Sequence, residues 1–175
     1  MIAAIRQALT IQPQETHQTP ALADLIPDRA RLAGCIDFED FCDLIDKEAT
    51  AHLTGVRLVR AARFRQMRRP RAYFDRKIDT HCLSVCLNNN RSMFAKAEAA
   101  DWIAMQEAGH NGLWMATICE GRLDVVTRLT PNPEDAAELT AVAGLILRDL
   151  GPDQEPGFVD GDRLNLRRTN LFPDV

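Results

Sequence analysis

Arginine side chains are concentrated in one segment of the sequence, residues 57–77, which reads "RLVRAARFRQMRRPRAYFDRK". This segment holds nine of the 21 basic residues of the chain and one of its 25 acidic residues, Asp75. The planar guanidinium group of arginine matches the oxygen atoms of a phosphate, and aromatic rings among such cations can stack on unpaired bases. The candidates for contact with nucleic acid are therefore Arg57, Arg60, Arg63, Arg65, Arg68, Arg69, Arg71, Tyr73, Arg76 and Lys77.

Two other partners for the same arginines stay open. An acidic stretch at residues 39–48 precedes the basic segment, and its carboxylates could pair with these arginines inside the chain. Alternatively, the segment could dock on an acidic partner protein or on the acidic stretch of a second copy. The net charge of the whole chain is −4, so the average composition does not by itself favour nucleic acid over a protein partner.

Residue types that bind metals or act as nucleophiles are present, but their spacing does not favour these roles. Cys82 and Cys86 share one face of an extended strand while His81 points to the other, and no second pair of ligands completes a zinc site. The four histidines are scattered, none lies in a nucleophile motif, and no glycine loop for phosphates occurs. We therefore expect no metal and no cofactor. The five cysteines are odd in number and irregularly spaced, so we expect reduced, mostly buried thiols.

The C-terminal segment "VDGDRLNLRRTNL" is the second candidate site. Aspartate and asparagine side chains can hydrogen-bond to nearby backbone and fix a turn. In residue types and spacing, residues 157–171 resemble the core of the HNH homing-type endonucleases of phage and bacterial genomes. The residues expected to form and order the turn are Asp160, Gly161, Asp162, Asn165 and Asn170. The resemblance implies that nearby arginines can meet a DNA backbone, and these are Arg163, Arg167 and Arg168.

The resemblance also implies that the catalytic groups are missing. In the family a histidine takes a proton from the attacking water, and a divalent metal ion binds the scissile phosphate. Phe158 stands at the position of that histidine, and Gly157 at the position of a metal ligand. Asn170 matches the asparagine that orients the histidine, and the helix with the last ligand is expected beyond Val175. We therefore expect no catalytic residues and no nuclease activity.

Three helices are expected to position these segments. Apolar residues at 38–49 repeat at helical spacing after Asp37, whose carboxylate can cap the first turn. A second helix is expected at 92–108, with Gly109 in the left-handed position that follows a helix. A third is expected to begin at Pro133 and to continue through Leu150.

Short strands are expected between these helices. Val56, Leu58 and Val59 predict a strand at 56–59, and "HCLSVCL" predicts one at 81–87, followed by a turn at 88–90. Residues 113–129 read as a hairpin with its turn at Glu120 and Gly121. The mixture predicts an α+β fold in which short antiparallel strands pack with about three helices and the chain ends in a truncated HNH-like strand and turn.

The size and composition indicate one folded domain. A length of 175 residues and a hydrophobic fraction of 46% are enough for a single core. We expect residues 1–34 to be an arm or linker, because the stretch "IQPQETHQTP" shows no periodicity, and residues 35–175 to form one α+β domain. No apolar run is long enough to span a bilayer, so we expect a cytoplasmic protein without a membrane partner.

Three functions follow from these features. The first is a non-catalytic HNH-like protein that binds nucleic acid through the basic segment. The second is a protein-interaction module, such as a regulator, an inhibitor or an assembly component of a phage or mobile element, that docks on an acidic partner or on itself. The third is a metal-dependent nuclease whose missing ligands come from elsewhere, for example from His81 or His110.

Overall fold

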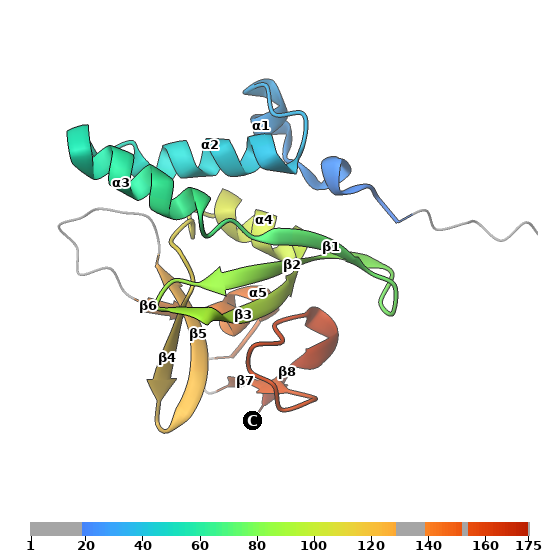
Figure 1. Cartoon of the computed structure of the whole chain (residues 1–175). Coiled ribbons are helices and arrows are strands. Elements are labelled where there is room, and N and C mark those ends of the chain that lie inside the picture. Colours follow the sequence, from blue (N-terminus) through green and yellow to red (C-terminus); the bar gives the residue numbers. More distant parts are fainter. Residues whose placement is uncertain (1–18, 129–138, 152–153, 175) are drawn as a thin grey trace, which may run out of the picture.

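A computed structural model describes residues 19–128, 139–151 and 154–174 of the chain. Within these residues five α-helices combine with three antiparallel sheets of three, three and two strands, which confirms the predicted α+β class (Figure 1). No helix in these ranges has the length and the apolar composition that crossing a membrane requires.

One three-stranded sheet, called sheet A below, forms a wall of the hydrophobic core. Its strands are β1 Arg71–Asp75, β2 Thr80–Leu87 and β3 Asn90–Glu98, antiparallel and in this order. The helices over it are α2 Phe38–Thr50 and α4 Ala99–Glu107. Side chains alternate between the two faces of a strand, and Leu83 and Ala97 are buried on the face toward these helices. Trp102 of α4 packs there against the rings of Phe38 and Phe41. Figure 1 shows the helices on one side of sheet A and the C-terminal segment on the other.

The second sheet continues the core beside sheet A. It contains β4 Met115–Cys119, β5 Arg122–Arg128 and β6 Leu139–Ala141. The predicted hairpin is confirmed: β4 pairs with β5, and Glu120 and Gly121 form the turn with φ of 51° and 77°. Helix α5, Val142–Leu147, follows β6 directly.

The C-terminal segment forms a small hairpin that also extends sheet A. Strands β7 Glu155–Phe158 and β8 Leu171–Asp174 pair antiparallel, and the 3-10 helix η2 Arg168–Asn170 precedes β8. Between them the chain runs along the edge of β3. The Lys96 N–H donates to the Leu164 carbonyl, and the Leu166 N–H donates to the Lys96 carbonyl, both at 2.7 Å.

Part of the expected N-terminal arm packs on this domain. Residues 19–34 include the 3-10 helix η1 Leu22–Leu25 and helix α1 Asp28–Leu32, and the side chains of Ile26 and Ala30 belong to the core. The free cysteines agree with the prediction of mostly buried thiols: Cys35, Cys42 and Cys82 are buried, Cys86 is half-buried and Cys119 is exposed.

The prediction of a strand at residues 56–59 is wrong, because helix α3 covers Gly55–Gln66. The β-branched residues that suggested a strand, Val56 and Val59, are exposed and contribute little to the core. The helix also contains four arginines and two alanines, residues that favour a helix. Helix α3 packs against α2, and this tertiary contact supports its helical form.

The predicted helix at 92–108 begins too early. Residues up to Glu98 belong to strand β3, because the turn at Asn88 and Asn89 folds this stretch back onto β2, and only Ala99–Glu107 are helical. Gly109 has the expected positive φ of 87°. Of the predicted third helix, residues 133–138 lie outside the described part, residues 139–141 form a strand, and α5 ends at Leu147, before Arg148 with a φ of 59°.

Candidate nucleic-acid interface

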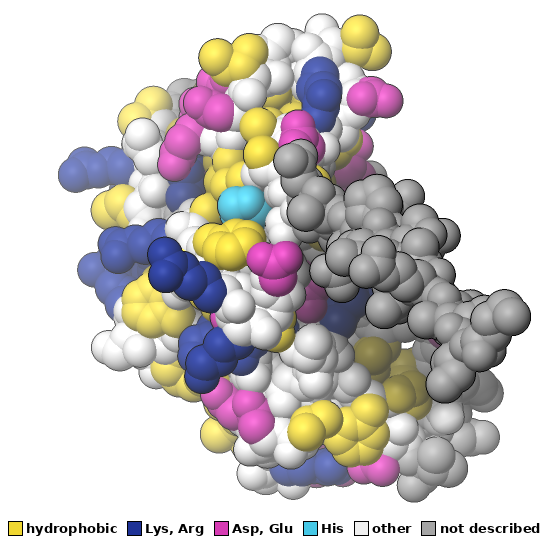
Figure 2. All heavy atoms as spheres, turned by 90° about the vertical axis from the view of Figure 1, so that its right-hand side faces the viewer, with side chains coloured by type: hydrophobic (Ala, Val, Ile, Leu, Met, Phe, Trp, Pro, Cys, Tyr) yellow, Lys and Arg dark blue, Asp and Glu magenta, His cyan; other side chains and the backbone are white. Residues whose placement is uncertain are grey.

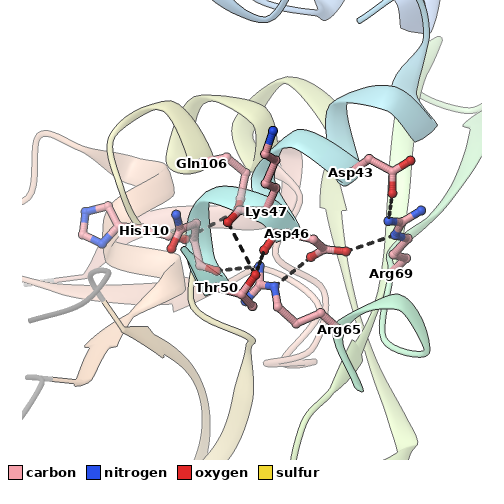
Figure 3. Close-up of polar contacts among 9 residues, drawn as sticks. Asp43, Asp46, Lys47, Thr50, Arg65, Arg69, Gln106 and His110 are labelled. Atoms are coloured by element: carbon pink, nitrogen blue, oxygen red, sulfur yellow. Dashed lines mark hydrogen bonds and ion pairs between the residues drawn. The ribbon is translucent and has the colours of Figure 1, made fainter. Parts of the chain in front are cut away.

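The middle of the basic segment is bonded to the acidic helix α2. Arg65 donates to Asp46 Oδ1 at 2.7 Å, and Arg69 donates to Asp46 Oδ2 at 3.1 Å. Arg69 also pairs with Asp43 and with Glu39. Figure 3 shows Asp46 lying between the two guanidinium groups. The alternative that arginines of this segment pair with the acidic stretch of the same chain therefore holds for Arg65 and Arg69.

Arg68 is buried inside the domain. The residue is 6% exposed, and its guanidinium group donates to the carbonyl oxygens of Leu87 at 2.8 Å and Asn88 at 3.0 Å. It also lies over the ring of Phe64, with Cζ 4.9 Å from the ring centroid. The β2–β3 ladder is irregular between Cys86 and Leu87, and Arg68 supplies charged donors to the backbone at this point.

The three C-terminal arginines are paired with aspartates from distant parts of the chain. The pairs are Arg163 with Asp124, Arg167 with Asp75 and Arg168 with Asp101, each with an N–O distance of 2.5 Å. Arg163 also donates to the Leu123 carbonyl at 2.7 Å, and Arg167 donates to Asn165 Oδ1 at 2.7 Å. These arginines hold the C-terminal segment against β5, β1 and α4. We therefore leave Arg65, Arg68, Arg69, Arg163, Arg167 and Arg168 out of the candidate interface.

The turn of the C-terminal segment is ordered by its aspartates and asparagines. Gly161 has a φ of 73°, which favours glycine at this point of the turn. Asn165 donates through Nδ2 to Asp160 Oδ2 at 2.6 Å, and the Asp162 N–H donates to Asp160 Oδ1 at 2.8 Å. Asn170 closes the loop: its Oδ1 accepts the Asp160 N–H at 2.9 Å, and its Nδ2 donates to the Asn165 carbonyl at 2.8 Å. The hydrogen bond from Asn165 is the main cause that lowers the pKa of Asp160.

Replacing Asn170 with alanine is expected to lower the free energy of unfolding by about 2 kcal/mol, because the buried Asn165 carbonyl loses its donor. Urea denaturation followed by circular dichroism measures this change. Thr169→Ala, at the exposed neighbouring position, is the control and is expected to change stability by less than about 0.5 kcal/mol. Equal stability of the two variants would contradict the structural role of Asn170.

The two positions at which the predicted resemblance would place catalytic residues, Gly157 and Phe158, are occupied by packing contacts. A Cβ atom at Gly157 would lie 2.4 Å from the ring of Phe172, which pairs with Gly157 across the β7–β8 ladder. The guanidinium group of Arg163 lies 4.7 Å from the centroid of the Phe158 ring. Among the described residues, no group of three or more His, Cys, Asp or Glu side chains is arranged to hold a metal ion. His81, one of the alternative ligands, packs edge-on against Phe74.

The remaining candidates lie at two separate places. Arg57, Arg60 and Arg63 are exposed on α3, whereas Arg71, Arg76 and Lys77 are exposed on β1 and on the β1–β2 turn. None of these six forms an ion pair with another described residue. Helix α3 and the β1–β2 turn lie at opposite ends of the molecule (Figure 1). The basic segment is thus divided into two exposed ends and a buried, paired middle.

The second exposed end continues onto the outer face of sheet A, the face away from α2 and α4. The strand registers place Arg71, Ser84 and Lys96 in one row across this face. The C-terminal segment lies on this side too: its Arg167 reaches Asp75, and Cys82 is buried there. The side chains of this face that stay exposed or half-buried are Arg71, Tyr73, Ser84, Cys86, Phe94 and Lys96. Lys96 and Phe94 were not among the sequence-based candidates, because residues 92–98 were expected to be helical. Strand alternation, with Ala95 and Ala97 inward, is the signal that identifies them.

Acidic groups on the outer face are already bonded. Asp75 is paired with Arg167, and Glu98 accepts the backbone N–H of Arg168 at 3.1 Å. Burial raises the pKa of Glu98, with a further contribution from Asp101. On the side of the molecule that carries the β1–β2 turn, Lys and Arg side chains gather in a group with hydrophobic side chains among them (Figure 2). Asp79, in the β1–β2 turn, is exposed and accepts a hydrogen bond from Thr19. The exposed cations of this region outnumber its acidic side chains, so its net charge is positive.

Comparison with family models, curated proteins and solved structures found no match to the chain. The HNH-like resemblance of residues 157–171 stays a prediction.

Proposed function

We propose that the chain binds nucleic acid, without cleaving it, through the outer face of sheet A and the adjoining β1–β2 turn. The observation that carries this proposal is the set of four exposed cations on this surface, Arg71, Arg76, Lys77 and Lys96, which have no ion pair with any described residue. Phosphate contacts of this kind supply most of the affinity for nucleic acid that is independent of sequence.

The proposal keeps the HNH-like ancestry of the C-terminal segment but gives the segment a supporting role. Arg167 crosses from this segment to Asp75, so it removes a negative charge from the outer face. Gly157 and Phe158 offer neither a metal ligand nor a base, which supports binding without hydrolysis. The cytoplasmic location predicted from the sequence belongs to the same proposal.

A salt titration tests this function. If about four phosphates are contacted, the logarithm of the affinity for a labelled oligonucleotide is expected to fall with the logarithm of the salt concentration with a slope of about −3. Fluorescence anisotropy at several salt concentrations measures the slope. An affinity that stays constant across the titration, or the absence of binding at low salt, would overturn the proposal.

A second candidate function, docking on a protein, is favoured by the surface of α3. Val56 and Val59 are 77% and 69% exposed and lie on this helix beside Arg60 and Arg63. Apolar side chains next to cations suit an acidic amphipathic partner, including the acidic helix of a second copy. Sedimentation of the chain over a range of concentrations, with Val59→Asp as the test variant, examines self-association. A monomer at every concentration would contradict the self-docking form of this function.

A further inference from the structure

We infer that the ligand of the outer face of sheet A is single-stranded nucleic acid, whose bases stack on Tyr73 and Phe94. This inference rests on the proposed function and adds the strandedness of the ligand and the groups that select it. Every base has an aromatic face, and in a single strand that face is free to stack on a protein ring. In a duplex the same faces are covered by neighbouring base pairs, and the phosphates remain as the main contact.

The register of sheet A places both rings on the same face. Tyr73 lies opposite Cys82 and Phe94 lies opposite Cys86, and the two cysteines are four residues apart in β2, so they point to the same side. Tyr73 is 36% exposed and Phe94 is 42% exposed. Four residues along a strand and two strand spacings across the sheet separate the rings by about 16 Å. This distance leaves room for more than one nucleotide between the two stacked bases.

The residues around the rings fit a nucleotide chain. Ser84, a small side chain, lies between Arg71 and Lys96 in the row that separates the two rings. The two cations are about 10 Å apart across the sheet, on either side of Ser84. Bases can therefore lie flat on the middle of the face while phosphates reach the cations at its edges.

The same features disfavour an apolar protein partner on this face. The exposed aliphatic side chains Val56 and Val59 lie on α3, whereas the uncovered part of the outer face offers two rings, two cations and small polar or thiol groups. A hydrophobic interface needs a contiguous apolar patch, and none of the rows across this face provides one. The outer face combines cations that have no ion pair with a described residue and two aromatic rings that lie apart. The phosphates and bases of a single-stranded nucleic acid match these two kinds of group.

Phe94→Leu and Phe74→Leu form a matched pair for the test. Both phenylalanines are 42% exposed and both belong to sheet A, but Phe74 points to the opposite face and packs on His81. Leucine keeps the apolar bulk and removes the aromatic face. Anisotropy with oligonucleotides of about 15 nucleotides, as single-stranded DNA, single-stranded RNA and duplex DNA, gives the affinities at low salt.

The expected result is that the chain binds single strands at least tenfold more tightly than the duplex. Phe94→Leu is expected to weaken single-strand binding by about tenfold, and Phe74→Leu to leave it within about twofold. Duplex binding equal to or tighter than single-strand binding, or equal effects of the two variants, would overturn the inference while leaving the proposed function intact. No binding to any of the three ligands would instead overturn the proposed function. The affinities for single-stranded DNA and for single-stranded RNA show which of the two is preferred.

Photo-cross-linking provides a second readout that does not depend on affinity. Irradiation of the complex with a single strand that contains 5-bromouracil is expected to attach the oligonucleotide to a peptide that contains Tyr73 or Phe94. Mass spectrometry of the digested complex identifies the attachment site. Attachment only to peptides of α3 would place the strand on the other exposed end of the basic segment and would contradict the inference.

Discussion

Replacing Arg68 with methionine is expected to lower the free energy of unfolding by about 3 kcal/mol, because two carbonyl oxygens lose a buried, charged donor. For a chain of this size, such a loss lowers the midpoint of thermal unfolding by about 10 °C. Methionine fills a similar volume, so the change isolates the hydrogen bonds to Leu87 and Asn88 and the contact with the Phe64 ring. Calorimetry or thermal circular dichroism measures the midpoint.

Arg63→Met is the matched control for this prediction. Arg63 lies on α3 and is exposed, so the same chemical change there is expected to alter the unfolding free energy by less than about 0.5 kcal/mol. Arg68→Lys tests whether the planar shape of the guanidinium group matters. The lysine ammonium keeps the charge, but it lacks the planar group that donates to two carbonyls and lies over the Phe64 ring. If Arg68→Met unfolds at the same temperature as Arg63→Met, Arg68 has no structural role.

The structural use of Arg68 also decides which variants can test binding. A combined replacement of Arg68, Arg69 and Arg71 would remove two side chains that hold the fold together with one that is exposed. Loss of binding in that variant would not separate a missing contact from a damaged domain. Only exposed cations without a partner among the described residues are suitable for such a test.

Features that depend on near neighbours in the chain could be predicted from the sequence. Helix α2 follows its N-cap Asp37, whose carboxylate accepts the Asp40 N–H at 2.9 Å, and its buried stripe has helical spacing. The hairpin at Glu120 and Gly121 and the turn around Gly161 are also local, because each is set by a few residues with special backbone angles.

Features that depend on distant partners could not be predicted. Strand β3 has apolar residues at spacings that fit a helix as well, and only its pairing with β2 decides the outcome. The same holds for the arginines: Arg167 meets Asp75, which is 92 positions away, and nothing in the local sequence distinguishes it from an exposed arginine. A helix at residues 92–98, which the local pattern favours, would not place Lys96 and Phe94 side by side with β2 on the surface of a sheet.

Replacing Arg71, Arg76 and Lys96 together with glutamine is expected to weaken single-strand binding by about 100-fold at low salt, because about three phosphate contacts are lost. The slope of the salt titration is expected to become shallower by about 2 for the same reason. All three side chains are exposed and none forms an ion pair with a described residue, so the unfolding temperature is expected to stay within a few degrees of the wild type. Anisotropy and thermal unfolding of the same preparations measure both effects.

The matched control is the replacement of Arg57, Arg60 and Arg63 on α3 with glutamine. Each triple variant removes three positive charges from exposed positions and takes the net charge from −4 to −7, so any general effect of charge is equal in the two proteins. The α3 variant is expected to keep its affinity within about threefold, because α3 lies at the other end of the molecule from the β1–β2 turn. A larger loss in the α3 variant than in the sheet variant would move the nucleic-acid interface to α3 and would remove the outer face of sheet A from it.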